Sequence, residues 1–135
     1  MKRHPDLLQL SREHYGALKL ARDARRAAES GEPGTVAALA QRVVKVFAAE
    51  LDPHFCVEEQ GILVLLAQAG QHELAQRTLT DHVELRRLAG ALETPDAGTL
   101  LRFAEVLGTH VRFEEREVFE AAQARLAMDG VGSTP

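Results

Sequence analysis

The sequence predicts an all-α protein that folds as an up-down-up-down antiparallel four-helix bundle. Three observations support this prediction. Apolar residues recur at steps of three and four along four long segments, which is the pattern of a helix with one buried face. Short connections with glycine and proline separate the segments, and such connections place consecutive helices antiparallel. No stretch alternates with period two for long enough to form a strand.

Glycine and proline residues set the limits of the four segments. Pro5 suits the first turn of a helix. Gly31, Gly70 and the sequence TPDAG mark segment ends. The second segment contains Pro53, which removes a backbone donor and crowds the preceding turn, so we expect a kink or brief interruption just before His54. The predicted segments cover approximately residues 5–29, 35–69, 71–93 and 96–128.

Length and composition fit a single domain. The chain has 135 residues, of which 45% are hydrophobic and 27% are charged, and its formal net charge is −4. This length is sufficient to bury a core. We predict one bundle domain at residues 1–128 and a disordered C-terminal tail at residues 129–135. The weak acidity argues against nucleic acid as a partner, because a phosphate-binding surface needs a basic excess.

The apolar runs are short. The longest, ILVLLAQAG, falls below the roughly 18–20 residues that a membrane span needs. The N-terminal sequence MKRHPDLLQL lacks the apolar stretch of a secretion signal. A single cysteine, Cys56, excludes an internal disulfide and fits a reducing compartment. The chain is therefore predicted to be cytoplasmic, with no membrane partner, and the sequence does not determine its oligomeric state.

Polar residues interrupt the apolar stripe of every segment. The second and fourth segments each contain a His-x-x-x-Glu unit in line with their core residues, and the first and third each contain one histidine. Residues four apart on a helix differ by about 40° and about 6 Å, so both side chains of a unit can reach one point. The inward-facing ionisable residues are His14, His54, Glu58, His82, His110 and Glu114.

These six side chains are predicted to meet at one height and to bind metal. Counting residues from the turns gives height mismatches of at most about 9 Å. Each unpaired buried charge or polar group costs several kcal/mol, so six would rival the whole stability of a domain, about 5–15 kcal/mol. Hydrogen bonds among them would satisfy one pair, whereas two divalent cations bridged by Glu58 and Glu114 would satisfy all six. A metal-free helical bundle is the alternative.

The order of these residues resembles the hemerythrin-like family, the HHE cation-binding domains. The resemblance covers about residues 4–125. It implies a non-haem di-iron centre in which Glu58 and Glu114 bridge the two irons alongside an oxo, hydroxo or water ligand. His14 and His54 would hold one iron, and the other two histidines would hold the second. Zinc and manganese are alternatives to iron.

The third segment departs from the family's oxygen carriers, which place two histidines four apart on this helix. Here the positions four before and four after His82 are Thr78 and Arg86. One iron should therefore have an open or water-filled position, or bind another side chain. Glu59 and Glu117 are the candidates for that extra ligand.

The resemblance and this departure leave two functional hypotheses. The first is a di-iron protein that binds or senses dioxygen or a related small ligand such as NO or peroxide. The second is a di-iron oxidase or peroxidase-like centre, or a protein of iron handling or iron–sulfur repair. Whether the chain is an enzyme stays open at this point, with the binding module favoured.

Other conspicuous residues are interpreted as bystanders. His4 and His72 each lie ten residues before a site histidine, about 15 Å along the helix axis, and are predicted to lie at the surface. Cys56 is predicted to be a structural thiol turned away from the ligand face. Glu13 and Asp81, which directly precede site histidines, are predicted to be exposed.

Overall fold

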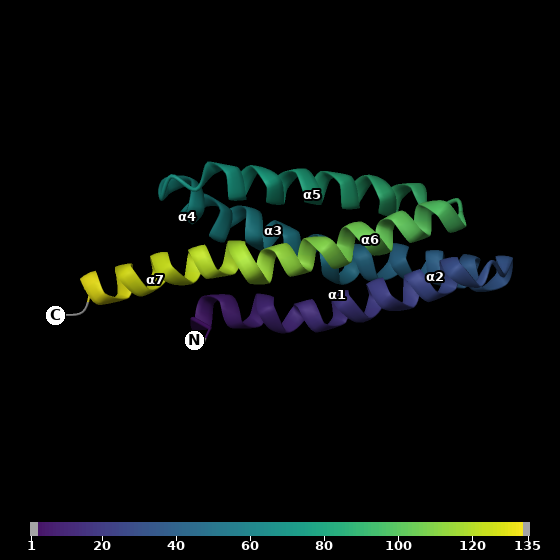
Figure 1. Ribbon diagram of the computed structural model, residues 1–135, viewed down its shortest axis with the longest axis horizontal. Coiled ribbons are helices and arrows are strands. Elements are labelled where there is room, and N and C mark those ends of the chain that lie inside the picture. The colour runs from purple at the N-terminus through teal and green to yellow at the C-terminus, as the bar shows by residue number, and fades with distance from the viewer. Residues whose placement is uncertain (1–2, 134–135) are drawn as a thin grey trace.

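The structure, a computed structural model, consists of four long helical rods that run alternately up and down (Figure 1). It describes the backbone of residues 3–133 and the side chains up to residue 127. This arrangement confirms the predicted all-α four-helix fold. Along the described chain, no helix is both long and apolar enough to cross a membrane. The rods are α1 (Pro5–Ser30); α2 (Pro33–Val46), η1 (Phe47–Leu51), α3 (Asp52–Gln60) and α4 (Ile62–Gln68); α5 (His72–Ala91); and α6 (Ala97–Phe113), η2 (Glu114–Val118) and α7 (Phe119–Ser133).

The rods begin and end where the sequence places its helix signals. Pro5 and Pro33 occupy the first turns of α1 and α2, where a missing N–H costs nothing. Gly31 ends α1 with a φ of 68°, a left-handed conformation that glycine adopts without a steric penalty. The Asp96 side chain accepts a hydrogen bond of 2.8 Å from the Thr99 N–H and so caps the start of α6. These signals explain why the predicted segments begin close to the observed helix starts and why the first segment ends close to its predicted end.

Two π-helical turns interrupt the rods. In η1 the Asp52 N–H donates to the Phe47 carbonyl, five residues back, directly before Pro53. This wider turn is the interruption that the proline predicts, because Pro53 has no N–H for the regular ladder. The second π turn, η2, begins at Glu114 and has no such sequence signal. A further break at Gly61, with φ −116° and ψ −91°, separates α3 from α4 and was also not predicted.

The last helix is longer than the sequence pattern indicates. The predicted end near Met128 is wrong, since α7 continues to Ser133. Isolated glycines, such as Gly130 and Gly132, cost only about 1 kcal/mol each in a helix, which does not force an end. The disorder expected of residues 129–135 stays a prediction, and residues 134–135 lie outside the described chain.

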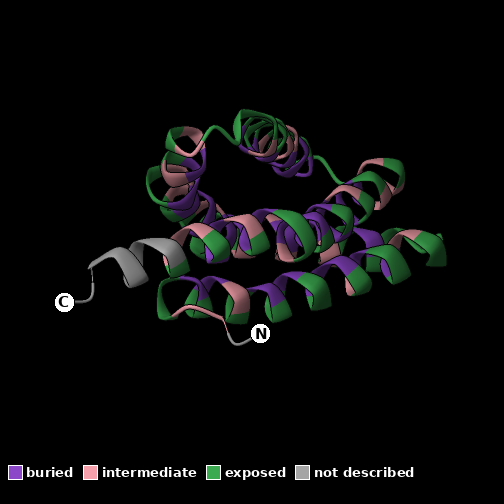
Figure 2. Cartoon of the chain, turned by 60° about the vertical axis from the view of Figure 1, so that its left-hand side comes forward, coloured by how far each residue is buried: buried purple, intermediate pink, exposed green. Residues whose placement is uncertain are grey.

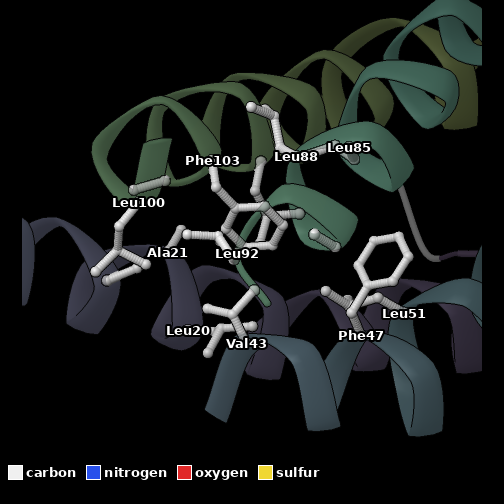
Figure 3. Packing of buried hydrophobic residues seen from close by; sticks show 14 of the residues in the cluster. Leu20, Ala21, Val43, Phe47, Leu51, Leu85, Leu88, Leu92, Leu100 and Phe103 are labelled. Atoms are coloured by element: carbon white, nitrogen blue, oxygen red, sulfur yellow. The ribbon is translucent and has the colours of Figure 1, made fainter. Parts of the chain in front are cut away.

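The core consists of two apolar clusters rather than one. Buried residues line the inner faces of all rods (Figure 2). The larger cluster joins α1, α2, η1, α3, α5 and α6, and Figure 3 shows Leu20, Val43 and Phe103 among its members. The smaller cluster includes Leu10 and Leu66 and packs around α4 and α7. The predicted polar residues lie between the two clusters, so apolar packing encloses them from both ends of the bundle.

Candidate metal centre

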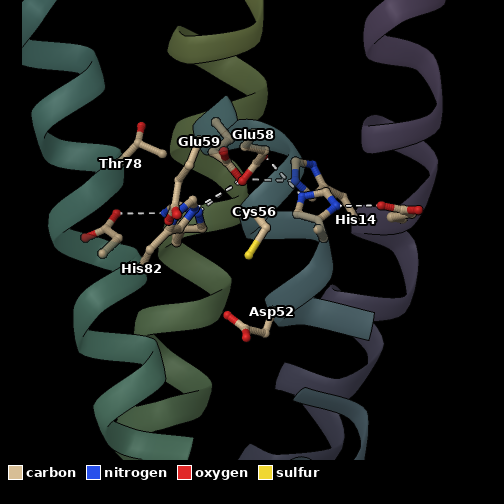
Figure 4. Close-up of polar contacts among 12 residues, drawn as sticks. His14, Asp52, Cys56, Glu58, Glu59, Thr78 and His82 are labelled. Carbon is tan, nitrogen blue, oxygen red and sulfur yellow. Dashed lines mark hydrogen bonds and ion pairs between the residues drawn. The ribbon is translucent and has the colours of Figure 1, made fainter. Parts of the chain in front are cut away.

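The structure brings the six predicted polar residues together in one buried layer. Each rod contributes at least one of them, and none has a relative exposure above 5%. Figure 4 shows His14, Glu58 and His82 converging from different helices at one level. The similar heights inferred by counting residues are therefore found in the fold. The set comprises His14 on α1, His54 and Glu58 on α3, His82 on α5, His110 on α6 and Glu114 at the start of η2.

The ligand-type atoms of this layer form two overlapping groups. Within each group the nitrogen and carboxylate oxygen atoms all lie within 4.8 Å of one another. Both glutamates belong to both groups, whereas each histidine belongs to one. The first group is His14, His54, Glu58 and Glu114, and the second is Glu58, His82, His110 and Glu114.

Each glutamate lies between imidazoles of the two groups. Glu58 faces the Nε2 atom of His54 at 3.1 Å and the Nε2 atom of His82 at 3.1 Å. Glu114 faces the Nε2 atom of His14 at 3.2 Å. It also faces Nε2 of His110 at 3.0 Å. This arrangement has two imidazoles at either end and a carboxylate pair in the middle.

Several polar atoms of the layer lack a hydrogen bond. Oε1 of Glu58, Oε2 of Glu114, Nε2 of His82 and Nε2 of His110 are buried and have no hydrogen-bond partner among the described residues. The close approach of His82 to Glu58 does not have hydrogen-bond geometry. Unsatisfied groups in such a place cost about 1–3 kcal/mol each. Their lone pairs converge, so the residues present fit a pair of bound cations.

The electrostatics of the layer favour added positive charge. Burial raises the pKa of Glu58 well above its ordinary value, and the charge of Glu114 adds to this effect. Burial also opposes ionisation of Glu114, but hydrogen bonding to Glu58 and the positive charge of His110 outweigh it and hold its pKa well below the ordinary value. Burial lowers the pKa of His110, yet the Glu114 charge and a hydrogen bond to Asp81 raise it to about 9. Two carboxylates in a dry layer thus draw in protons, or cations in their place.

Comparison with known protein families agrees with this geometry. A model of the family described as "Hemerythrin HHE cation binding domain" matches residues 7–122. The chain belongs to the hemerythrin HHE cation-binding family. No curated protein and no solved structure matches it. The family is defined by cation binding, and the buried His/Glu groups of this HHE domain could hold the cations.

An outer set of carboxylates contacts the histidines from the side away from the centre. Two of these acids, Glu13 and Asp81, are predicted from the sequence to be exposed, and their side chains do reach solvent, at 43% and 25% exposure. Each nevertheless accepts a hydrogen bond from a site histidine: Glu13 from Nδ1 of His54 at 2.7 Å, and Asp81 from Nδ1 of His110 at 2.9 Å. The prediction that they are bystanders is therefore wrong.

The extra ligands suggested by the sequence do not enter the two groups. Glu59 binds Nδ1 of His82 at 2.7 Å instead of facing the centre. Glu117 is exposed. Thr78, four residues before His82, is fully buried and donates its hydroxyl hydrogen to the Leu74 carbonyl at 2.8 Å. Within the described residues, the two ends of the centre thus have two imidazoles each.

The remaining predicted bystanders lie outside both groups. His72, in the first turn of α5, is exposed. His4 caps α1 by accepting a hydrogen bond from the Asp6 N–H. Cys56 is a half-buried free thiol whose sulfur lies 3.9 Å from a guanidinium nitrogen of Arg86. These positions agree with their interpretation as residues away from the centre.

A cavity of about 560 Å³ connects one side of the centre with the surface. It lies between α1 and the η1–α3 region, and His14 and His54 form part of its wall. Small residues, Gly16, Ala17 and Ala49, also line it. These small side chains leave open space between the helices beside His14 and His54.

Proposed function

We propose that this HHE domain binds two iron ions in the His/Glu layer and that the two-metal centre binds dioxygen or a related small ligand, such as NO or peroxide. The observation that supports this most strongly is the pair of four-residue groups that share Glu58 and Glu114. In this proposal His14 and His54 bind one ion, and His82 and His110 bind the other. Both glutamates, which belong to both groups, would be shared by the two ions.

The donor set supports iron or manganese over zinc. Two imidazoles with carboxylate oxygens and open positions are typical of non-haem ferrous sites, whereas structural zinc sites are closed and tetrahedral. Each ion would have two imidazoles and two bridging carboxylates. An octahedral metal retains positions beyond these four for an exogenous ligand, and manganese would fit the same set. A di-iron pair, when bound, supplies the redox and Lewis-acid chemistry for small oxygen and nitrogen ligands.

The residues around the layer would protect such a centre from bulk water. The ring of Phe55 stacks on His82 with centroids 4.0 Å apart and an interplanar angle of 14°. The ring of Phe119 stacks on His14 at 5.1 Å and 16°. Both phenylalanines belong to the apolar clusters that enclose the layer. Entry would then depend on the cavity beside α1, which suits a small ligand.

The cavity also supports a second candidate, an oxidase or peroxidase-like activity. A volume of about 560 Å³ exceeds what a diatomic ligand needs and lies in the range of substrate pockets, about 300–1,000 Å³. In that case an organic reductant or peroxide would lie beside His14 and His54 during turnover. Iron handling, including iron–sulfur repair, would instead require metal exchange through the same opening.

Metal analysis and ligand binding test the proposal together. The protein is expressed with sufficient iron, purified, and analysed for metal content, and we expect about two irons per chain. The reduced protein should then change its visible absorption on exposure to air. Glu58→Ala and Glu114→Ala should lose both properties, whereas His72→Ala, which removes an exposed histidine of α5, should keep both. Iron-free protein, or equal metal content in Glu58→Ala and His72→Ala, would refute the proposal. Sustained peroxide consumption that requires Glu58 would favour the enzymatic candidate.

A further inference from the structure

The outer carboxylates are arranged in a circuit around the bundle. Each of the four rods supplies one carboxylate to a histidine of the next rod, and a histidine of each rod contacts a carboxylate of the preceding rod. The Nδ1 contacts are Glu13 of α1 with His54 of α3 at 2.7 Å, Glu59 of α3 with His82 of α5 at 2.7 Å, Asp81 of α5 with His110 of α6 at 2.9 Å, and Glu115 of η2 with His14 of α1 at 2.6 Å. The last pair returns to α1, so the circuit is closed.

Every carboxylate of the circuit directly adjoins a residue of the inner layer in the sequence. Glu13 and Asp81 each precede a histidine, and Glu59 and Glu115 each follow a bridging glutamate. A position next to an inward-facing residue is turned by about 100° on the helix, which points it towards the neighbouring rod. One helical turn therefore provides both an inner group and a support for the histidine of another rod.

The circuit fixes which nitrogen of each ring faces the centre. Both acids also accept hydrogen bonds from groups that can only donate: Glu59 from the Arg86 guanidinium at 2.8 Å, and Glu13 from the Gln9 amide nitrogen at 3.1 Å. An ionised carboxylate only accepts hydrogen bonds, so the contacted Nδ1 must bear the hydrogen. In a neutral imidazole, Nε2 then presents its lone pair to the centre.

The four carboxylates are of two kinds. Glu59 accepts from the Arg86 guanidinium at 2.8 Å, and Glu115 forms an ion pair with Arg3 at 3.0 Å. In the part of the chain that the structure describes, Glu13 and Asp81 form no ion pair with an arginine or lysine. A carboxylate that is not shared with a guanidinium accepts the Nδ1 hydrogen more strongly. The ring then carries more electron density, and Nε2 becomes a better electron-pair donor to a metal.

We propose that the four outer carboxylates are positioning residues for the metal centre, and that Arg86 and Arg3 weaken two of them, so that each ion has one stronger and one weaker histidine donor. This inference rests on the proposed binding of two cations. The stronger donors are His54, supported by Glu13, and His110, supported by Asp81. The weaker donors are His82 and His14. The two ends of the centre are therefore matched in donor strength even though their supporting residues differ.

Metal affinity tests the positioning role. Glu13→Gln and Asp81→Asn keep an oxygen that accepts the Nδ1 hydrogen but lose the charge. The affinity for Zn²⁺ and Co²⁺ alone, measured by competition with a chelator, should fall by about 10- to 100-fold. Glu84→Gln is the matched control, because the ion pair of Glu84 among the described residues is with Arg87 on the same helix. Far-UV circular dichroism checks that all variants are folded. Equal affinity in Glu13→Gln, Asp81→Asn and the control would overturn the proposal.

The reduction potential of the iron-loaded protein tests the role of Arg86. Arg86→Gln should keep its metal content but shift the midpoint potential to more negative values, because Glu59 then accepts the Nδ1 hydrogen of His82 more strongly, which makes His82 a better metal donor and favours the ferric state. Arg86→Lys, which keeps the positive charge, should restore the potential towards that of the wild type. Arg87→Gln removes a neighbouring ion pair without touching the circuit and should change nothing.

The possible failures of the two proposals are distinguishable. A potential of Arg86→Gln equal to that of Arg87→Gln, in protein that binds two metals, would overturn the inference on the outer carboxylates and leave the metal centre intact. A wild-type chain that binds neither iron, zinc nor cobalt would overturn the proposed function and this inference with it. Arg86 also contacts Asp52 at 2.7 Å, so Arg86→Gln can lower the stability of the protein. Such a loss of stability does not by itself change the midpoint potential, which is the quantity that tests the inference.

Discussion

Glu58 provides the sharpest test of whether cations balance the polar layer. Its side chain is fully buried, and its Oε1 has no hydrogen-bond partner among the described residues. Glu58→Met replaces the carboxylate with an apolar chain of similar volume. In metal-free protein this change should increase stability, because it removes a buried acid whose Oε1 is unsatisfied, and this gain should exceed the loss of the 3.1 Å contact between Oε2 and His54. In metal-loaded protein the same change should decrease stability, because a bridging ligand is lost.

The expected magnitudes are large enough to measure. Replacing buried ionic groups with apolar residues of similar volume stabilises proteins by up to about 1–4 kcal/mol. One orphaned oxygen corresponds to the lower half of that range, about 1–2 kcal/mol. Saturating metal at about 1,000 times its dissociation constant stabilises the native state by about 4 kcal/mol. The sign of the effect of Glu58→Met should therefore reverse between chelator and metal.

Thermal unfolding in both conditions is the assay. Wild type and Glu58→Met are melted with excess chelator and with excess Zn²⁺, which avoids oxidation. A change of 1 kcal/mol moves the midpoint by about 3–5 °C for a chain of this length. Glu105→Met, at an exposed position of α6, is the control and should change stability by no more than about 0.5 kcal/mol. Destabilisation of Glu58→Met by the same amount with and without metal would refute the argument.

Three further predictions follow from the same structure. Metal uptake at pH 7 should release protons, because the His110 pKa of about 9 keeps that imidazole protonated before binding and burial raises the pKa of Glu58, which favours its protonated form; affinity should fall as the pH falls, and calorimetry in buffers of different ionisation enthalpy counts the protons. Phe103→Ala, in the larger apolar cluster, should cost about 3–5 kcal/mol in urea unfolding, and a cost below 1 kcal/mol would contradict the packing described. Ala49→Trp should slow azide binding to the metal-loaded centre in stopped-flow measurements without reducing metal content, whereas Ala48→Trp, outside the cavity lining, should not.

The inner layer could be predicted from the sequence because its residues obey helical periodicity. His14 and Glu58, for example, replace core residues on stripes that are otherwise apolar, and the energetic cost of burying them is independent of structural detail. The kink before His54 followed from Pro53, which has a direct effect on backbone hydrogen bonds. The break at Gly61 had only a glycine as its signal, and a glycine inside a helical pattern is usually tolerated.

The outer carboxylates were missed for a different physical reason. Periodicity assigns a residue to the core or to solvent by its angle on its own helix, and Glu13 and Asp81 fall on the solvent side by that criterion. Their contacts are made across the boundary between two rods, which depends on how far one helix is rotated against the next. That rotation is a property of the packed bundle. An acid beside a buried histidine or glutamate on each helix was the available signal.

The division of the core into two apolar clusters makes the protein modular. Leu20 and Leu66 belong to different clusters, and the layer of imidazoles and carboxylates lies between the clusters. Because the polar layer separates the two clusters, a side-chain substitution in one cluster has little direct effect on packing in the other. Substitutions could therefore change the stability of one end of the bundle, or the surface of the other end, while the central polar layer stays the same. Evolution and protein engineering can modify these two regions separately.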